Sequence, residues 1–275
     1  MDWSRTKTIF IVTFFILDLF LGYQLYQKQS ENKFEYMSES SVKIEDQLAK
    51  SNITYEELPE APKALSHVIG ETYVFSTEDV DNLISDDASI KISEDDIRLH
   101  VTFEEPRATI EAETESKSLL SYHALFHEDY VFAEHLSDKN NSLVYIQTYD
   151  GRPIYQKEDS ANGQITVHLD ENNDITGFSQ TYLVTTEEGK EQEILSAIKA
   201  INQLFNNNKL KDDDKITQIE LGYYSLIKGK VQVLAPTWFI EVNGERHYYV
   251  NAINGLIDDP NTELIQEIGE GDDER

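Results

Sequence analysis

An apolar run from Ile9 to Leu25 is the feature that most constrains this 275-residue chain. The run contains one charged residue, Asp18, and is followed by Tyr26, an aromatic residue of the kind that gathers at membrane interfaces. A helix that crosses about 30 Å of hydrocarbon needs about 20 mostly apolar residues. The sequence therefore predicts a single transmembrane helix over residues 9–27.

The two sides of this run differ in charge. Residues 1–30 hold two acids and three bases and carry +1 of the formal net charge of -29, so the remaining residues carry -30. Arg5 and Lys7 lie in the short N-terminal tail, and bases beside a membrane helix are enriched on its cytoplasmic side. We therefore expect residues 1–8 in the cytoplasm and the acidic region after the helix outside the cell, attached to the cell membrane.

A cleaved signal peptide is the alternative interpretation of the same run. The apolar part of a signal peptide usually has about 7–15 residues and ends in small residues around a cleavage site. The run in this chain is longer, and the segment from Leu21 to Tyr26 has no such pattern. The sequence therefore favours an uncleaved anchor.

Asp18 lies near the middle of the predicted membrane helix. A charged Asp at mid-bilayer costs about 2.5–3.5 kcal/mol on insertion scales, so such a residue usually faces a partner. One interpretation is a protonated Asp that an apolar helix tolerates. The other is a contact with a second transmembrane helix, because a polar and a small residue on one face are typical of such contacts. The predicted partner-binding face consists of Ile11, Phe14, Phe15, Asp18, Leu21, Gly22 and Leu25.

The region outside the membrane has the pattern of an α+β fold. Residues 31–41 are polar and predict a loose stalk, followed by a short helix at best over 42–48. Apolar residues at three- and four-residue spacing predict helices over 118–136 and 191–205, and Thr77 is the expected cap of a shorter helix. Alternating or β-branched runs predict strands over 67–75, 90–92, 97–103, 143–149, 152–155, 164–169, 175–184, 215–227, 231–233, 238–242 and 247–252.

The order of helix followed by antiparallel strands occurs twice. YIQTYDGRPIY, from Tyr145, and WFIEVNGERHYYV, from Trp238, each place an Asx-Gly turn between aromatic strands. Either a duplication or the ordinary composition of hairpins explains this similarity. We expect two helix-on-antiparallel-sheet subdomains, over residues 28–185 and 186–268, and a disordered acidic tail over 269–275.

The composition excludes several classes of function. The chain has no cysteine, which excludes disulfides, thiolate catalysis and cysteine-based metal sites. The acidic balance argues against nucleic-acid binding, which needs bases to neutralise phosphates. No G-x-S-x-G motif and no glycine-rich phosphate loop is present. We expect neither an enzyme nor a bound cofactor.

Two sequence patterns resemble metal sites. His123 and His127 are four residues apart on a predicted helix, as metal ligands can be, but a polar helix face explains them more simply. Residues 170–174 resemble the start of a calcium loop, although Ile175 and Thr181 replace the required Gly and Glu, so a turn is the better interpretation. We therefore expect no metal site.

Acidic and aromatic clusters give two further alternatives. The acidic runs 94–96 and 212–214 would serve a wall-active hydrolase only if the fold placed them in one cleft, and solvated turns are the simpler interpretation. The aromatic pairs 223–224 and 248–249 could line a groove for a cell-wall component or peptide, or they could pack in the core.

The chain resembles the YycI family of low-GC Gram-positive bacteria over nearly its whole length. The resemblance starts with Met1-Asp2-Trp3-Ser4-Arg5-x-Lys7-Thr8-Ile9-Phe10-Ile11, which leads directly into the membrane helix. It continues in Glu45-Asp46-Gln47-Leu48, Asn52-Ile53, Leu221-Gly222-Tyr223-Tyr224, Ala235-Pro236-x-Trp238 and Tyr248-Tyr249-Val250-Asn251-Ala252. The last two are shared more loosely with PepSY-like domains.

The resemblance implies regulation and not catalysis. Members of the YycI family are membrane-anchored accessory proteins. Together with the related YycH protein they act on YycG (WalK), the essential sensor histidine kinase that controls cell-wall metabolism, and the transmembrane helices are implicated in that contact. By this resemblance, the kinase and a YycH-like protein are the expected partners of residues 9–25. The family also implies an uncharged residue such as Asn at position 18, where this chain has Asp.

Overall fold

A computed structural model describes most of the chain after residue 38. The described residues are 13, 14, 17, 20, 39–81, 83, 87–107, 112–138, 141–157, 162–225 and 229–260. The chain divides into two compact units, residues 1–47 and 48–275. In the first unit, residues 13, 14, 17 and 20 are helical. The elements described below belong to the second unit, except that the first helix, α2, starts before residue 48.

The elements of the structure are few helices and many strands, which confirms the predicted α+β class. The helices are α2 (Glu39–Lys50), α3 (Thr77–Asp81), α4 (Ala112–His123) and α5 (Ala197–Asn206), with 3₁₀ turns η1 (His127–Asp129) and η2 (Glu134–Leu136). The strands are β1 (Ala64–Thr72), β2 (Ala88–Ile92), β3 (Leu99–Arg107), β4 (Tyr130–Phe132), β5 (Ser142–Tyr149), β6 (Arg152–Tyr155), β7 (Gln164–Leu169), β8 (Ile175–Gln180), β9 (Leu183–Glu193), β10 (Ile216–Ser225), β11 (Val231–Val242), β12 (Arg246–Asn251) and β13 (Ile257–Asp258).

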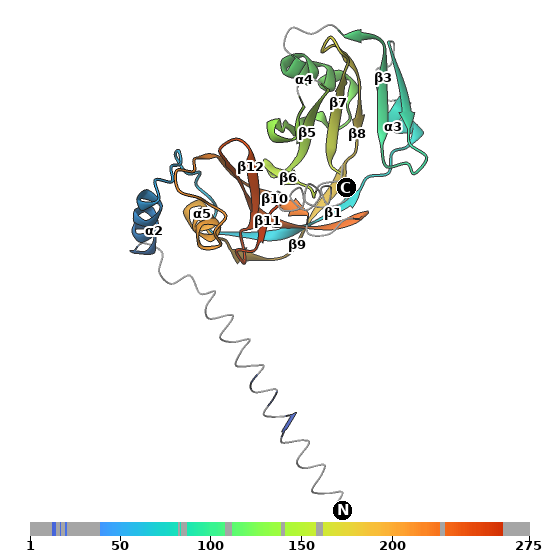
Figure 1. Cartoon of the computed structure of the whole chain (residues 1–275). Coiled ribbons are helices and arrows are strands. Elements are labelled where there is room, and N and C mark those ends of the chain that lie inside the picture. The colour runs from blue at the N-terminus through green and yellow to red at the C-terminus, as the bar shows by residue number, and fades with distance from the viewer. Residues whose placement is uncertain are drawn as a thin grey trace, which may run out of the picture. The chain divides into compact units, whose positions relative to one another are not determined.

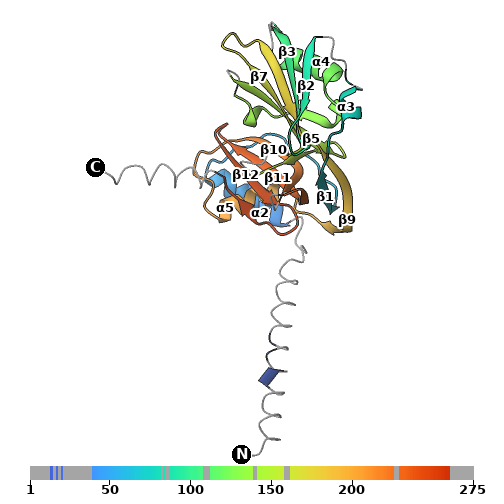
Figure 2. The ribbon, with the colours of Figure 1, turned by 90° about the vertical axis from the view of Figure 1, so that its right-hand side faces the viewer.

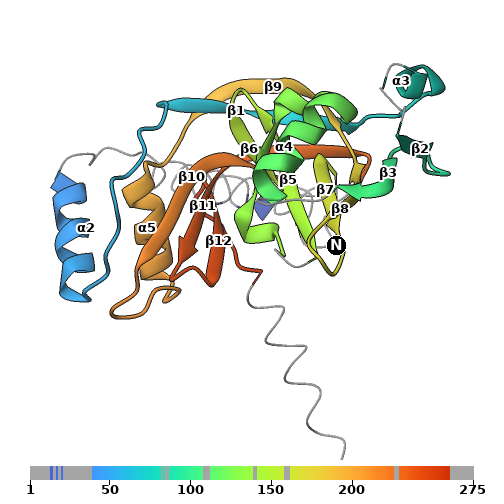
Figure 3. The same ribbon diagram turned by 90° about the horizontal axis from the view of Figure 1, so that it is seen from above.

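The strands form one large mixed sheet in the part of the chain that the structure describes. Its main path runs β13-β12-β11-β10-β6-β5-β7-β8-β3-β2, with β4 beside β5 and with β1 between β9 and β11. The pairing of β6 with β10 is parallel, whereas the other pairs are antiparallel. Figure 1 shows α4 beside β5 and β7, and α5 beside β10 to β12. Figures 2 and 3 show the same two groups from the side and from above.

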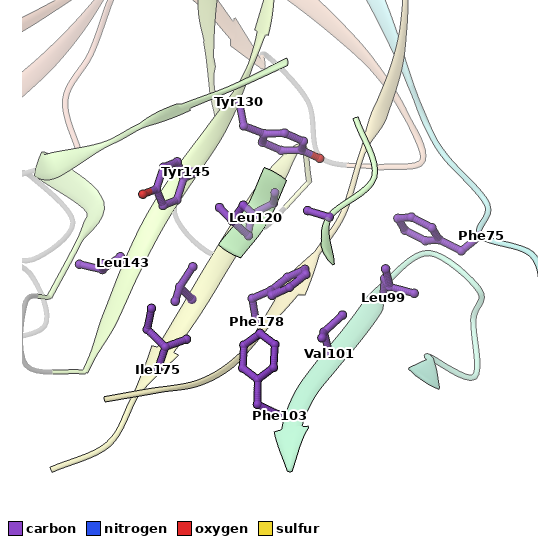
Figure 4. Close-up of a cluster of buried hydrophobic side chains, with 13 residues drawn as sticks. Phe75, Leu99, Val101, Phe103, Leu120, Tyr130, Leu143, Tyr145, Ile175 and Phe178 are labelled. Carbon is purple, nitrogen blue, oxygen red and sulfur yellow. The ribbon is translucent and has the colours of Figure 1, made fainter. Parts of the chain in front are cut away.

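A hydrophobic core lies between α4 and the strands β3, β5, β7 and β8. Leu120 of α4 faces Phe178 and Tyr145, and the aromatic rings fill the space between the helix and the sheet (Figure 4). Val101 and Phe103 of β3 also belong to this core, because alternate residues of the strand point inward. Burial of a side chain of this size contributes roughly 1.5–3 kcal/mol, which is why this sheet face and α4 hold together.

The second helix packs on the opposite end of the sheet. α5 buries five side chains, among them Ile201 and Leu204, as its strong apolar spacing requires. The indole N–H of Trp238, on β11, donates to the carbonyl of Leu195 just before α5, at 2.8 Å. This bond satisfies the polar atom of a fully buried Trp and fixes the start of the helix against the sheet.

Pro236 marks the point at which β11 changes its neighbour. Before it, Val231 to Leu234 pair with β1, and after it, Thr237 to Val242 pair with β12. A proline has no N–H to donate, so a strand tolerates it where the ladder changes partner. The sequence predicts two separate strands on either side of this proline, and the structure joins them into one.

Three helices differ from the sequence prediction. The helix predicted over 118–136 ends at His123, and β4 and the two 3₁₀ turns follow it. The helix predicted from residue 191 starts at Ala197, because residues up to Glu193 extend β9 along β1. In place of the short helix predicted over 42–48, the structure has the longer helix α2, which includes the last residues of the predicted stalk.

The cap of α3 is also shifted by one residue. The Oγ of Ser76 accepts the N–H of Asp79 at 3.3 Å, and the carboxylate of Asp79 accepts the N–H and hydroxyl of Ser76 at 2.7 Å. These reciprocal bonds form a capping box. Ser76, and not Thr77, is therefore the cap.

Candidate functional site

The predicted membrane face falls almost entirely outside the described residues. Phe14 is described, is helical and is 59% exposed. The other predicted residues of this face lie outside the described part of the chain: Ile11, Phe15, Asp18, Leu21, Gly22 and Leu25. Among the helices that the structure describes, none combines the length and apolar character that a membrane crossing requires.

The histidine pair does not form a metal site. His123 is the last residue of α4 and lies buried with its ring 5.3 Å from that of Phe103. His127 starts a separate 3₁₀ turn, and between them Phe126 adopts a left-handed backbone conformation. The two residues therefore do not share one helix face. The described residues contain no group of three or more possible metal ligands.

The calcium-like segment is a turn, as the simpler interpretation predicts. Oδ1 of Asp170 accepts the backbone N–H groups of Asn172 and Asp174 at 2.8 and 3.0 Å. These bonds fold the connection from β7 to β8. Asn173 takes the left-handed conformation that Asn tolerates.

The two acidic runs lie in different connections of the sheet. Residues 94–96 are in the turn between β2 and β3, and residues 212–214 precede β10. Asp214 is buried and accepts hydrogen bonds from Arg246 Nη2 at 2.6 Å and from Asn243 Nδ2 at 2.8 Å. Burial acts to raise its pKa, but these bonds and one from the Lys211 N–H outweigh it and lower the pKa. Asp214 is a structural carboxylate.

The four clustered tyrosines pack in the core, in agreement with one of the two sequence interpretations. Tyr223, Tyr224, Tyr248 and Tyr249 are all buried. Tyr224 and Tyr249 lie two strands apart, and their rings stack at 4.3 Å between centroids with an angle of 13° between planes. The ring of Tyr249 also contacts Phe239 and Tyr155, so that an aromatic cluster covers this face of the sheet.

The cluster ends at a half-buried histidine, His135. The ring of His135 lies 4.5 Å from that of Phe239 and 6.0 Å from that of His247. Its Nε2 is buried and has no hydrogen-bond partner among the described residues. Burial, with a smaller contribution from His247, lowers the pKa of His135 from 6.5 to about 4. The neutral ring therefore belongs to the packing of this face at pH 7.

The other end of the aromatic face opens into a cavity of about 360 Å³. Its lining combines two aromatic rings, two amides and an ion pair, from Tyr224, Tyr249, Asn251, Asn254, Lys157 and Asp258. Oδ2 of Asp258 accepts the hydroxyl of Tyr224 at 2.8 Å and lies 3.3 Å from Nζ of Lys157. A concave site with a few convergent polar groups is the usual form of a small-molecule site.

The sequence indicates only part of this cavity. The aromatic pairs point to Tyr224 and Tyr249, but Lys157 and Asp258 are brought to them by the parallel pairing of β6 with β10 and by the short edge strand β13. The residue types at Asn254-Gly255 predict a turn, although nothing in the sequence ties its side chains to the tyrosines.

Comparisons with known proteins cover most of the chain. The model of the YycI protein family matches residues 31–253. No curated protein sequence matches the chain. A solved structure of an uncharacterized protein from Eubacterium rectale ATCC 33656 has 12% identity and a TM-score of 0.48, over 75% of this chain and 90% of that one.

The solved structure of YycH from Bacillus subtilis has 17% identity and a TM-score of 0.41. That similarity covers 68% of this chain and 52% of the YycH chain. The family model, in contrast, covers well over half of the present sequence, including the described elements from α2 to β12. On that match, the chain belongs to the YycI family, whose members are non-enzymatic regulatory proteins.

Proposed function

We propose that this chain is a membrane-anchored accessory regulator of a YycG/WalK sensor histidine kinase, acting through its transmembrane helix in a complex with a YycH-like protein. The observation that carries the proposal is the family match over residues 31–253. Membership in the YycI family implies an accessory role in the YycG/WalK system. The contacts of the transmembrane helix with the kinase and the YycH-like protein are a more specific proposal than the accessory role itself.

The proposed topology rests on charge and hydropathy. Residues 1–8 are cytoplasmic, residues 9–27 span the membrane, and the acidic remainder is extracellular. Arg5 and Lys7 support this orientation, and a net charge of -30 after residue 30 keeps the large region away from anionic lipid headgroups.

The domain boundaries stay predictions. Two subdomains over 28–185 and 186–268 are supported by the packing of α4 and of α5 on different parts of the sheet. Two hairpins with the same left-handed turn, at Asp150-Gly151 and Asn243-Gly244, also support them. β1 belongs to the first region and pairs with β11 of the second region. Two duplicated units would therefore share a sheet across their boundary.

A regulator of this kind works by differential contact. A bound helix shifts a kinase between two arrangements only if it contacts one arrangement better than the other. Asp18 would supply such a contact, because an interhelical partner for its carboxyl relieves the cost of leaving it in hydrocarbon.

The test is affinity purification from membranes with two forms of the chain. In one, residues 1–30 are native; in the other, they are replaced by an unrelated single-pass anchor with the same flanking charges. Both forms stay in the membrane, so only the helix sequence differs. The proposal predicts that the native form recovers the kinase and the YycH-like protein and that the replaced form loses most of both. Equal recovery by the two forms would refute the helix contact.

A second candidate function is an extracytoplasmic binding module for a cell-wall component or peptide. The cavity beside Tyr224 and Tyr249 favours it. A wall-active hydrolase, the third alternative from the sequence, is not supported, because the family is non-enzymatic. The binding role and the regulatory role are compatible in one chain.

A further inference from the structure

The cavity beside Tyr224 is bordered by β11, the strand that lies between Tyr224 of β10 and Asn251 of β12. Tyr224 of β10 pairs with Ala235 of β11, and Asn251 of β12 pairs with Thr237 of β11. Ala235 and Thr237 are two residues apart and so lie on the same face of the strand. Both side chains are small and buried, and Thr237 lines the cavity. The hollow is therefore built into the register of the sheet.

The amides of the cavity present donors. Oδ1 of Asn251 accepts the N–H groups of Ile253 and Asn254, at 2.9 and 3.0 Å. Oδ1 of Asn254 accepts the N–H of Leu256 at 3.0 Å. The turn thus uses the oxygen of each amide, and the Nδ2 groups take no part in it. Two N–H₂ groups are therefore the hydrogen-bonding capacity that these side chains offer a ligand.

The charged groups of the cavity balance each other. Lys157 and Asp258 form a partly exposed ion pair, with 41% and 37% of their side chains accessible. Between them they offer ammonium donors and carboxylate acceptors at no net charge. A neutral ligand fits such a lining better than an anion does, since the chain as a whole carries -29.

The remaining lining is apolar. The rings of Tyr224 and Tyr249 lie on one side, and Leu256 and Ile257 lie at β13 on the edge of the sheet. Leu256 is 69% exposed. An exposed leucine beside a cavity provides a surface for a methyl group or for the carbon face of a ring.

We propose that this cavity binds an N-acetylated sugar. The hydroxyls of a pyranose ring match the mixed donors and acceptors of Lys157 and Asp258, and its carbon face matches the apolar part of the lining at Leu256 and Ile257. The acetamido carbonyl accepts from the Asn251 or Asn254 amide, and its methyl group packs against Leu256. The volume of about 360 Å³ lies at the lower end of the range of roughly 300–1,000 Å³ for small-molecule sites, which suits a one- or two-ring ligand.

The test is calorimetric titration of the purified full chain, held in a detergent without a sugar head group. The ligands are N,N′-diacetylchitobiose, maltose and D-alanyl-D-alanine, each titrated to the same concentration. The chitobiose derivative should bind, and maltose, which lacks the acetamido group, should bind at least fivefold more weakly, the effect of about one hydrogen bond. Asn254→Ala and Lys157→Ala should each weaken binding of the chitobiose derivative about fivefold.

Two matched variants control for surface changes. Lys215→Ala removes an exposed lysine that pairs with Glu56, and Asn172→Ala removes an exposed turn amide between β7 and β8. Neither residue lines the cavity, so both variants should bind the sugar like the unmodified chain. Tryptophan fluorescence from buried Trp238 reports that each variant is folded.

Three outcomes would overturn the proposal: no heat from the chitobiose derivative, equal affinity for maltose, or binding that Lys157→Ala and Asn254→Ala leave unchanged. Binding of the dipeptide alone would make the cavity a peptide site and refute the sugar. The inference deepens the second candidate function and is separate from kinase regulation. Recovery of the kinase from membranes should be the same for Lys157→Ala as for the unmodified chain, so the two proposals fail independently.

Discussion

His135 shows how one half-buried residue links the stability of the fold to pH. Its ring is packed against Phe239 with His247 and Tyr155 nearby, and its pKa is lowered to about 4. In the unfolded chain a histidine has a pKa of about 6.5. Above pH 6.5 the ring is neutral in both the folded and the unfolded chain, so its titration does not change the free energy of unfolding there. As the pH falls from 6.5 through 4, the unfolded chain takes up the proton first and the folded state loses stability.

Replacement of this histidine gives the first residue-scale prediction. Between pH 7.5 and pH 5, the unmodified chain should lose about 2 kcal/mol of unfolding free energy through His135. The reason is that protonation stabilises the unfolded chain by about 1.4 kcal/mol for each pH unit below the unfolded-state pKa of the histidine. His135→Phe keeps a ring against Phe239 and removes the titration. Urea unfolding at the two pH values should show a pH-dependent loss smaller by that amount. His127→Asn is the control and should leave the loss unchanged; an identical loss in His135→Phe would contradict the assignment.

Turn residues are predictable at this scale, and close packing is not. The Asx-Gly pairs at 150–151 and 243–244 adopt the left-handed conformations that their residue types favour. Gly222 has a different reason to be glycine: a Cβ there would collide with the carbonyl of Pro153 and lie 2.6 Å from the ring of Tyr155. That contact arises only from the parallel pairing of β6 with β10, which no local pattern encodes.

At the scale of elements, α4 shows why helical spacing can mislead. Apolar residues recur at helical intervals from 119 to 136, yet the helix ends at His123. Beyond it, Tyr130 pairs with Gln147 of β5 and donates its hydroxyl to the carbonyl of Thr181 at 2.5 Å. Hydrogen bonds to distant strands outweigh a local preference that amounts to tenths of a kcal/mol per residue. Similar competition from β1 extends β9 into the predicted start of α5.

The hairpin of β11 and β12 is held by one carboxylate, which gives an element-scale prediction. Asp214 binds Arg246 and Asn243 of the hairpin through its side chain, and its carbonyl accepts the N–H of Thr54 at 3.0 Å. Asp214→Ala removes the carboxylate partner of the half-buried Arg246 guanidinium, whose Nη1 still donates to the carbonyl of Lys209 and the hydroxyl of Tyr248. The cost should therefore be about 3 kcal/mol, the low end of the range for buried pairs. Chemical denaturation should show that loss.

The neighbouring acid supplies the control for this variant. Asp212→Ala alters an exposed residue of the same connection and should change the unfolding free energy by less than about 0.5 kcal/mol. Equal effects of the two variants would mean that Asp214 stabilises the fold no more than a surface charge does. Because the pKa of Asp214 is lowered, its contribution is present above about pH 4 and is lost as the pH falls below it.

At the scale of the whole molecule, the order of elements along the chain is largely predictable, and their arrangement in the sheet is not. Alternation within strands such as β3 and β7 shows which residues face the core. It does not show that β1 inserts between β9 and β11, because residues far apart in sequence must meet for that pairing. The cavity depends on the same long-range pairings, and for this reason the sequence indicates only its tyrosines.

The net charge has a clear meaning at this scale. A charge of +1 over residues 1–30 and of -30 over residues 31–275 agrees with the proposed division into a membrane anchor and an extracellular region. The family match starts at residue 31, so it identifies the region beyond the anchor and leaves the proposed helix contacts to experiment.

Site-directed crosslinking in membranes tests the central claim most directly. The chain has no cysteine, so a single introduced cysteine reacts at one known position. Cysteines at Ile11, Asp18 and Leu25 lie on the proposed face, whereas cysteines at Thr13 and Phe20 lie about 140° and about 160° around the helix from Asp18. The account predicts crosslinks to the kinase or the YycH-like protein from the first three positions and little or none from the last two. Equal crosslinking around the helix, or none to either protein from any position, would contradict it.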